Sequence, residues 1–374
     1  MSEIKGIKKS KFLILVYKII NKIYYYLKKN DDVFIYKTYL GKNLEKNIRV
    51  NFNQISSHFL YLEEKKNLVE KLNRKILRLD FECKNQFENF IKDIIIDLIP
   101  LIYIENFKYF KSSLLDLPFP KNPKLILSSH ILNNSQTSLY TAEKLENGCK
   151  LVYGQHGGVY GQYKFAWKEK HELEVCDKYL TWGWKKKNDK KIIPFGTIKD
   201  LDNYKFNSQN LNYSNNLLLI CRARSRYEHK LNSSNGINQF DKYIQDNLNF
   251  GSYLDTKIRK DLIVRLHTRK YGWLEDERWK DLFKGNIEVD WGDKPIINMI
   301  NNSKLVVCSY IGTTYLETLP KNIPTIIFEN FKNTLFREDV KEHLNELKNA
   351  NILFENPESA SKFVNQNWNN LSEW

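Results

Sequence analysis

Short apolar runs that alternate with helical segments constrain the fold of this chain more than any other feature. Six such runs follow one another between residues 217 and 354: LLLICRA, LIVRLHT, NIEVD, KLVVCSY, TIIFEN and ANILF. Helical patterns lie between them, near 238–248, 252–260, 294–302, 314–320 and 337–348. Apolar runs of strand length separated by helices are typical of a parallel sheet covered on both faces. The sequence therefore predicts a doubly wound α/β domain here.

The first half of the chain is predicted to be a helix-rich α/β region. The run KLILSSH at 124–130 precedes a helical segment that stops at Gly148, and the run KLVYGQH follows it, which predicts a parallel β-α-β unit. A further strand is expected in DVFIYKTYL at 32–40. Helices are expected over 63–81 and 87–104, where apolar residues recur three and four positions apart.

Length and a change in composition set the expected domain boundaries. At about 150 residues per domain, 374 residues correspond to two or three domains. The polar, turn-rich interval 201–216 is interpreted as a linker. We expect an N-terminal domain over 1–205, a Rossmann-like domain over 214–356 and a last helix over 357–374.

The charge balance indicates an anionic partner. The chain has 59 Lys and Arg against 44 Asp and Glu, a net charge of +15, while its 42% hydrophobic content excludes a wholly disordered chain. A basic protein of this kind suits nucleic acid, an acidic membrane surface or phosphorylated substrates. The chain is also rich in Lys, Asn and Ile, a composition that an A- and T-rich genome yields without a functional cause.

Cysteine usage and the N-terminus indicate the cellular compartment. The five cysteines lie far apart without a C-x-x-C pair, which argues against a disulfide framework or a structural zinc site and favours a reducing cytosol. The basic segment 8–29 is interrupted by Lys18 and Lys22, so it is too short and too charged to span a bilayer. Two interpretations stay open: peripheral contact with the inner membrane, or packing on the first domain, which we favour. The expected location is cytoplasmic.

The segment KLVVCSYIGTTYLET is a candidate phosphate site. A strand is expected to end at Ser309, a loop with Gly312 follows, and a helix begins at Thr313 or Thr314. Free amides at a helix N-terminus bind phosphate well. The spacing of Thr314 and Glu317 also suits a capping box, in which these residues only cap the helix.

Cationic side chains follow two other strands. Arg265, His267 and Arg269 lie at the end of LIVRLHTRK, where strand alternation predicts that they share one face, and Arg222 and Arg224 follow LLLIC. Such a cluster can neutralise phosphate charge, with Arg giving forked contacts. Arg269 is alternatively a solvated loop charge.

The run LVYGQHGGVYG contains the candidate general base. Gln155 and His156 leave a strand directly into Gly157 and Gly158, whose lack of side chains lets a ligand approach closely. A neutral histidine there is suited to taking a proton from an attacking hydroxyl. The alternative is a turn histidine whose ring is already hydrogen-bonded. Tyr160 is placed in the same acceptor-side loop.

The adjoining run ELEVCDKYLTWGW offers a partner for this histidine. Glu172 either orients His156 or lies on a helix surface, and Trp182 and Trp184 are expected in the core. Walker A, G-x-G-x-x-G, H-E-x-x-H and G-x-S-x-G motifs are all missing from the sequence. These absences favour a transferase that handles a phosphorylated leaving group with cationic side chains and helix dipoles.

The blocks GCKLVYGQHGGVYG, ELEVCDKYLTWGW and YIGTTYLETLPKNIPTIIF resemble transferases of bacterial O-antigen and surface-polysaccharide loci, over roughly residues 120–345. The order of strand-end motifs is more distantly similar to CDP-glycerol glycerophosphotransferases and capsule Kdo transferases. The resemblance implies a GT-B fold, with two Rossmann-like domains facing across a cleft. It places the acceptor on the N-terminal domain and the donor nucleotide on the C-terminal one.

Site roles follow from the resemblance residue by residue. It makes His156 the candidate base, directs His267 to the donor phosphate and gives Glu317 a ribose hydroxyl. The hydroxyl-bearing phosphate loop corresponds to Ser309, Thr313 and Thr314. The sequence departs from the glycerophosphotransferases at Thr268, where they usually have Pro, and at Ile311-Gly312, which replaces a Ser-rich loop, so their donor does not carry over.

The sequence therefore predicts a GT-B-type glycosyltransferase without metal or cofactor. Its partners would be a nucleotide-activated sugar and a glycan or lipid-linked acceptor of surface-polysaccharide or O-antigen synthesis. Two alternatives stay open: a basic nucleic-acid-binding protein, and a catalytically silent scaffold at the membrane. Dispersed lysines and the lack of a recognisable binding module argue against the first.

Overall fold

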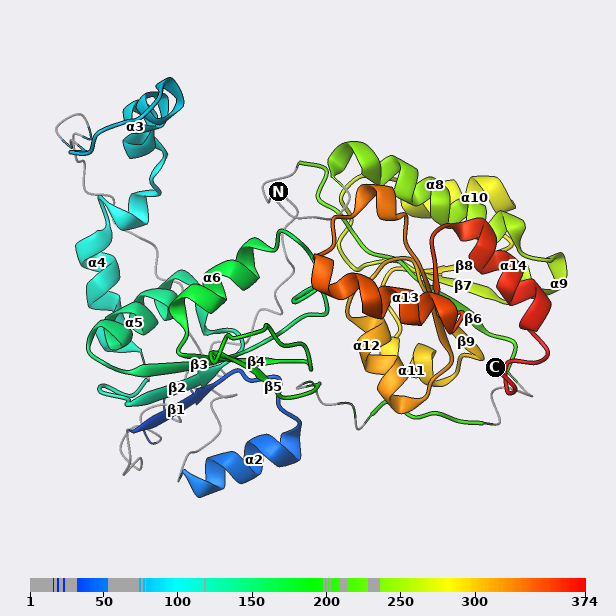
Figure 1. Ribbon diagram of the computed structural model, residues 1–374, viewed down its shortest axis with the longest axis horizontal. Helices are drawn as coiled ribbons and strands as arrows, with labels where there is room; N and C mark the ends of the chain where they lie inside the picture. The colour runs from blue at the N-terminus through cyan, green and yellow to red at the C-terminus, as the bar shows by residue number, and fades with distance from the viewer. Residues whose placement is uncertain are drawn as a thin grey trace. The chain divides into compact units, whose positions relative to one another are not determined.

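The computed structural model describes residues 16, 19, 23, 32–52, 74, 77, 79–117, 119–197, 199, 201, 203–208, 214–227 and 236–374 (Figure 1). Almost all of the basic segment 8–29 and most of the helix predicted over 63–81 lie outside these residues, so both stay predictions. The chain divides into two compact units. The smaller unit comprises Met1–Thr38 and Glu45–Val152, and the larger comprises Tyr39–Leu44 and Tyr153–Trp374.

The first sheet has the strand order β1-β2-β3-β4-β5. Its strands are β1 (Val33–Tyr36), β2 (Leu125–Ser128), β3 (Lys150–Gly154), β4 (Lys178–Thr181) and β5 (Ile192–Pro194). The helices of this part are α2 (Lys42–Asn51), α3 (Gln86–Leu98), α4 (Phe107–Ser112), α5 (Ser135–Glu146) and α6 (Trp167–Val175), with 3₁₀ turns at Leu101–Tyr103, Ser113–Asp116 and Ile131–Asn133. Strands β1 and β2 pair in parallel with Phe34 opposite Ile126, and β4 and β5 pair in parallel with Leu180 opposite Ile193.

The predicted β-α-β unit is confirmed as β2-α5-β3. Helix α5 begins after Asn134, whose side chain accepts a hydrogen bond from the amide of Gln136. It ends before Gly148, which has a φ of +87° that favours glycine. Aromatic rings fill the core of the smaller unit, where the centroid of Phe119 lies 4.8 Å from that of Phe34 and 5.0 Å from that of Tyr140.

The second sheet is parallel and has the strand order β11-β10-β9-β6-β7-β8. Its strands are β6 (Leu217–Ile220), β7 (Leu262–Arg265), β8 (Glu288–Asp290), β9 (Leu305–Cys308), β10 (Thr325–Phe328) and β11 (Leu353–Phe354). The helices are α8 (Ile237–Tyr253), α9 (Thr256–Arg259), α10 (Glu275–Phe283), α11 (Ile296–Asn301), α12 (Thr314–Thr318), α13 (Lys341–Asn349) and α14 (Pro357–Asn367), with 3₁₀ turns at Leu319–Lys321, Phe331–Asn333 and Glu338–Val340. All six predicted strands are present.

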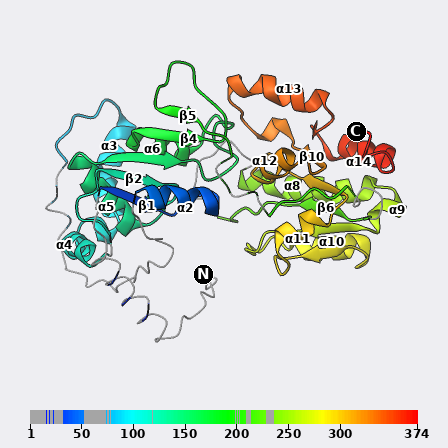
Figure 2. The same ribbon diagram turned by 90° about the horizontal axis from the view of Figure 1, so that it is seen from below.

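Both faces of this sheet are buried. Leu217 and Leu219 of β6 join a hydrophobic core with α8 and α14, while Leu218 and Ile220 join a second core with α11 and α12. Figure 1 shows helices on both sides of the sheet, and Figure 2 shows the same arrangement from below. The sequence prediction of a doubly wound α/β domain is thus confirmed. The arrangement of the two sheets across a cleft and the functional domain boundaries stay predictions.

Candidate active site

The second sheet changes winding direction between β6 and β9. The chain runs from β6 outward through β7 to β8, and from β9 outward through β10 to β11. Ligands of open parallel sheets bind at the carboxyl ends of the strands beside such a switch point. Arg222 follows β6 closely and Ser309 follows β9 directly, so two predicted site segments lie at this position.

Buried hydrogen bonds fix the loop after β9. Ser309 is 2% exposed, and its hydroxyl lies 2.6 Å from the Tyr243 hydroxyl and donates to the carbonyl of Ile220 at 3.1 Å. The Ile311 amide donates to the buried carboxylate of Glu329 at 2.8 Å. Ser309 thus fixes the loop within the fold, and its predicted contact with phosphate stays a prediction.

The predicted capping box at the start of α12 is wrong. Helix α12 follows Thr313, which adopts a helical conformation and makes no side-chain cap. The two carboxylate oxygens of the buried Glu317 accept instead from the Lys199 ammonium and the Tyr204 hydroxyl. A charge partner and a phenol far away in the sequence therefore outcompete the local cap. The ribose contact of Glu317 and the phosphate contact of Thr314 stay predictions.

The His-Gly-Gly motif meets the loop after β9. The amide of Gly158 donates to the Thr313 hydroxyl at 3.0 Å. A Cβ atom on Gly158 would lie 2.0 Å from the carbonyl oxygen of Gly312, so the backbones approach as closely as two glycines allow. Both segments belong to the larger unit. The structure thus brings together two motifs that the sequence indicated separately.

Residues just after this motif strengthen the junction. The Tyr315 hydroxyl donates to the side-chain oxygen of Gln162 at 2.9 Å, and the Tyr163 hydroxyl donates to the carbonyl of Ile311 at 3.2 Å. All four residues are buried. A buried hydrogen bond that is broken leaves costly unsatisfied groups, so these contacts hold the two segments in one geometry.

His156 lies in a cluster of side chains that can bind its ring nitrogens. The Tyr160 hydroxyl lies 3.0 Å from its Nε2, and the Glu172 Oε1 lies 3.5 Å from its Nδ1. The Tyr39 ring stacks near the imidazole, with centroids 6.5 Å apart. The His156 side chain keeps 14% of its surface exposed, while that of Glu172 keeps 3%. Of the two interpretations of Glu172, the one that places it beside His156 describes the structure.

Burial sets the protonation of Glu172. Desolvation raises the pKa of its carboxyl to about 8, although hydrogen bonds from the hydroxyls of Tyr179 at 2.9 Å and Tyr160 at 3.3 Å act in the opposite direction. Burial and the nearby Glu172 also raise the pKa of Tyr160. The Tyr160 hydroxyl thus stays protonated and lies within hydrogen-bonding reach of both His156 and Glu172.

Gln155 shapes the turn that carries His156. Its side-chain oxygen accepts from the Trp182 amide at 2.9 Å and from the Trp184 indole at 2.7 Å, and its amide group donates to the carbonyl of Gly157 at 2.7 Å. The side chain is completely buried. Gln155 is therefore a support of the loop, and the two tryptophans, expected in the core, are partly exposed and bound to it.

Arg222 is a cation at the switch point whose side chain keeps 11% of its surface exposed. Its guanidinium lies 4.8 Å from the Tyr243 ring centroid and 5.6 Å from that of Tyr310, and its Nη2 lies 3.9 Å from the Glu329 carboxylate. The Nε and Nη2 atoms make no hydrogen bond with any described residue. Arg222 therefore retains donors for an anion. The neighbouring Arg224 is half-buried, and its contact with phosphate stays a prediction, as does that of Arg222.

The cations after β7 lie at and beyond the end of the strand, and their common face stays a prediction. Strand β7 ends at Arg265, which pairs with the buried Asp290 and donates to the carbonyl of Lys294 at 2.6 Å. His267 and Arg269 follow the strand and are exposed, and the Arg269 amide donates to Nδ1 of His267 at 3.0 Å. Partial burial, Arg269 and Arg265 lower the pKa of His267. Phosphate contacts by these three residues stay predictions.

Sequence reasoning missed several members of the site. Glu329, which anchors the loop after β9, directly follows the run TIIF, and this position at a strand end could have indicated it. Tyr179 lies in the quoted run ELEVCDKYLTWGW but was given no role. Tyr39 carries no signal in the sequence, because only the fold brings it to His156.

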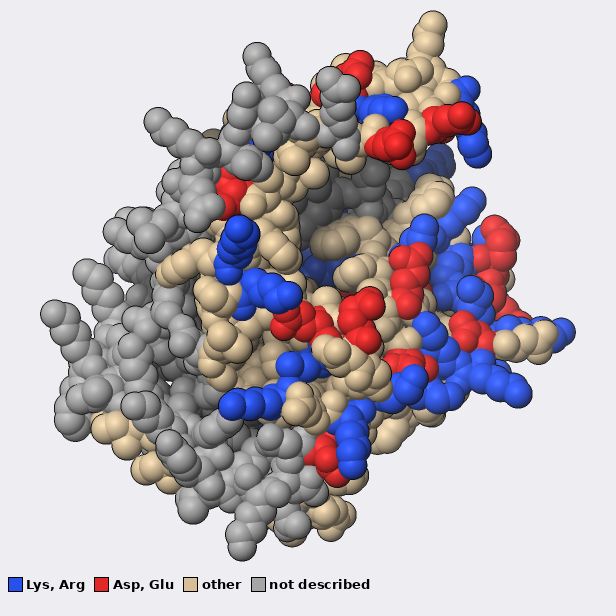
Figure 3. All heavy atoms as spheres, turned by 90° about the vertical axis from the view of Figure 1, so that its left-hand side faces the viewer, with Lys and Arg blue, Asp and Glu red and all other residues tan. Residues whose placement is uncertain are grey.

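Three properties of the described residues bear on other classes of function. On the face drawn in Figure 3, Lys and Arg lie among Asp and Glu. No group of three His, Cys, Asp or Glu in the described part of the chain could hold a metal ion. None of the helices among these residues has the length and apolar character that crossing a membrane requires.

Two solved structures show remote likenesses to this chain. MurG of Acinetobacter baumannii has 9% sequence identity and a TM-score of 0.38, with 73% of this chain and 70% of MurG covered. The wall teichoic acid polymerase TagF has 10% identity and a TM-score of 0.36, with 97% of this chain and 86% of TagF covered. Neither likeness is close enough to carry an argument. No curated protein matches the chain.

Comparison with protein families gives a match over almost the whole chain. The model of the LIC12162 family transferase matches residues 2–374, which include both sheets, the His156 cluster and the loop after β9. This protein therefore belongs to the LIC12162 family of transferases, and it is an enzyme that transfers a group.

Proposed function

We propose that this transferase is a GT-B-type glycosyltransferase that moves a sugar from a nucleotide-activated donor to a hydroxyl group. The acceptor would be a glycan or lipid-linked molecule of bacterial surface-polysaccharide or O-antigen synthesis, reached at the cytoplasmic face of the inner membrane. One observation supports the proposal most: Gly158, two residues after His156, is hydrogen-bonded to Thr313 of the loop at the switch point. The residues proposed as base and as phosphate site thereby lie in one unit.

In this proposal His156 takes the proton of the acceptor hydroxyl while that oxygen bonds to the anomeric carbon of the sugar. The bond between sugar and phosphate breaks, and its electron pair leaves with the nucleotide. Arg222 and the helix start at Thr314 would stabilise the negative charge that develops on the phosphate. Such electrostatic stabilisation is usually the largest contribution to catalysis. Glu172 would act as a positioning residue that keeps the imidazole in place.

A nucleotide screen tests the donor. CMP, CDP, UDP, GDP and dTDP are added separately to the protein, and its melting temperature is measured. We expect one base to stabilise the fold, because a ligand at 100 times its Kd adds about 2.7 kcal/mol to the free energy of unfolding. The absence of a shift from every nucleotide would contradict a nucleotide-activated donor.

The matching nucleotide sugar then tests the base. His156→Ala should keep the thermal shift by the nucleotide but lower the release of nucleotide from the sugar donor by about 100-fold or more, since general-base catalysis contributes that much. His343→Ala is the control, because His343 is exposed on α13 and pairs only with Glu346 among the described residues. Equal turnover in both variants would remove His156 from the proposed role.

A further inference from the structure

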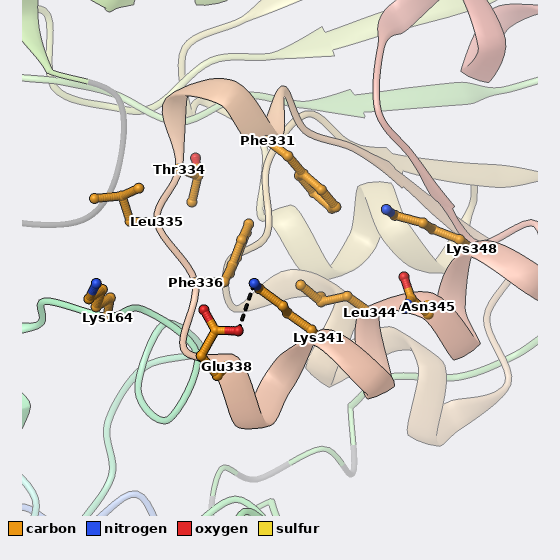
Figure 4. A pocket seen from close by; sticks show the side chains of 10 residues that line it. All are labelled: Lys164, Phe331, Thr334, Leu335, Phe336, Glu338, Lys341, Leu344, Asn345 and Lys348. Atoms are coloured by element: carbon orange, nitrogen blue, oxygen red, sulfur yellow. Dashed lines mark ion pairs between the residues drawn. The ribbon is translucent and has the colours of Figure 1, made fainter.

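The larger unit contains a pocket beside α13. It has a volume of about 390 Å³, within the range of about 300–1,000 Å³ that is usual for small-molecule sites. Figure 4 shows its lining, which is drawn from α13, the two 3₁₀ turns before it and Lys164. None of the lining residues belongs to the His156 cluster or to the loop after β9.

The walls of this pocket are partly apolar. The rings of Phe331 and Phe336 lie edge to face with centroids 5.2 Å apart, and the buried Leu344 lies opposite them (Figure 4). Leu335 adds a side chain that is 54% exposed. A ligand here would cover apolar surface that now faces water, which favours binding of an apolar group.

The charged lining residues give the pocket an excess of positive charge. Lys164, Lys341 and Lys348 line it together with a single carboxylate, that of Glu338, which lies 2.7 Å from the Lys341 ammonium. The Lys348 ammonium lies 4.5 Å from the Phe331 ring centroid and pairs with the carboxylate of Glu355, which does not line the pocket. No carboxylate of the described residues lies within ion-pair distance of Lys164. With Lys341 and Lys348 paired, Lys164 is the lining cation that can attract an anionic group such as a phosphate monoester, which carries about −1.5 to −2 at pH 7.

We propose that this pocket binds an anionic amphiphile, namely a phosphate group attached to an aliphatic chain. The chain would lie against Phe331, Phe336 and Leu344, and the phosphate would contact the Lys164 ammonium at the rim. Lysine binds phosphate as a point charge without demanding a fixed geometry, so an ammonium group at the rim suffices. The site is separate from the proposed transfer reaction and does not depend on it.

Calorimetric titration of the full chain tests the two parts of the ligand. Decyl phosphate below its micelle concentration should bind one to one. Decanol and inorganic phosphate should each bind at least about 10-fold more weakly, because each lacks one of the two interactions. Decanol binding as tightly as decyl phosphate would overturn the assignment of Lys164, and binding of inorganic phosphate alone would overturn that of the apolar wall.

Two pairs of variants locate the site. Asn345 is exposed and lines the pocket, so Asn345→Trp should fill it and abolish decyl phosphate binding, while Asn349→Trp on the same helix, outside the lining, should not. Lys164→Gln should weaken binding about 3- to 10-fold, as expected for a lost charge-assisted contact, and the exposed Lys362→Gln should not. Equal affinity in the two tryptophan variants, both shown to be folded by circular dichroism, would overturn the site.

Vesicles distinguish the source of the phosphate. If the native ligand is a membrane lipid, vesicles of phosphatidic acid and phosphatidylcholine should retain the protein in sedimentation, and Asn345→Trp should release it. If the ligand is a free alkyl phosphate, Asn345→Trp should abolish the binding of decyl phosphate and leave the retention by vesicles unchanged. Retention of both tryptophan variants, combined with unaltered decyl phosphate binding, would contradict either source.

Discussion

At the scale of single residues, the Glu172 carboxyl is the acidic group of the His156 cluster, and burial changes its protonation. It is almost fully buried, lies beside two tyrosine hydroxyls and has a pKa raised to about 8 by desolvation. The sequence left Glu172 open between orienting His156 and lying on a helix surface, and its burial beside His156 decides for the first position. The partner of Arg265 could not be found from local spacing, since Asp290 lies on the neighbouring strand and only the sheet register brings the two together.

The raised pKa predicts a pH-dependent effect of Glu172→Gln on stability. The folded pKa of about 8 lies above the ordinary value of 4.5, so the folded protein binds the extra proton and Glu172 lowers stability as pH rises from about 4.5 to 8. Glutamine stays neutral at every pH. The variant should match the parent at pH 4, below both pKa values, and exceed it at pH 8.5 by about 1–3 kcal/mol in urea unfolding.

A second carboxylate on α6 provides the control for this measurement. Glu174 is two residues further along and 63% exposed at its side chain. Glu174→Gln should leave the difference in stability between the two pH values as it is in the parent. A Glu172→Gln variant that loses stability with rising pH as steeply as the parent would contradict buried protonation at this site.

At the scale of elements, the junction between the His-Gly-Gly turn and the loop after β9 defines the site. The six strands of the second sheet could be predicted because each is a short apolar run with turn residues beside it. Helix α10 was missed, since it is charged, short and begins after Leu274 in a left-handed conformation rather than after a side-chain cap. The capping box at Thr314 failed for a related reason: local spacing carries no information about distant partners such as Lys199.

Substitution of Gly158 tests this junction. A methyl group there would lie 2.0 Å from the Gly312 carbonyl and 2.7 Å from Thr313 Cα, both backbone atoms. Gly158→Ala should therefore separate the two loops and lower the free energy of unfolding by about 1–3 kcal/mol, as overpacking does. The neighbouring Gly157→Ala is the matched control, because its added methyl group would first meet the Tyr160 ring at 3.4 Å. Equal unfolding midpoints would show that the loops do not pack as described.

At the scale of the whole molecule, the net charge of +15 is the difference between 59 Lys and Arg and 44 Asp and Glu. Acidic side chains lie among the basic ones on the face in Figure 3, and several surface lysines, among them Lys124, Lys294 and Lys348, pair with carboxylates. Nucleic-acid binding needs a basic stripe that releases many counterions at once. The cations that matter for the proposed function are instead few and local, with Arg222 the most buried of them.

This distribution predicts weak binding to nucleic acid. A labelled random oligonucleotide should show little change in anisotropy when the protein is added at 150 mM salt. Any binding at 50 mM salt should be weak, and the logarithm of its binding constant should fall only slowly with the logarithm of the salt concentration. A DNA-binding protein of similar net charge serves as the positive control. Tight binding at 150 mM with a steep salt slope would instead revive the nucleic-acid alternative.

The hydrogen bonds that join residues 158–204 to residues 311–317 have a practical consequence for dissecting the enzyme. The composition changes near 205–214, but cutting the chain there would separate three hydrogen-bonded pairs. The Tyr315 hydroxyl would lose Gln162, the Thr313 hydroxyl would lose the Gly158 amide, and the Glu317 carboxylate would lose the Tyr204 hydroxyl. A fragment that starts at residue 214 would thus expose unsatisfied polar groups beside the loop after β9. Separate production of the part that carries the second sheet should begin no later than Tyr153, where the larger unit resumes.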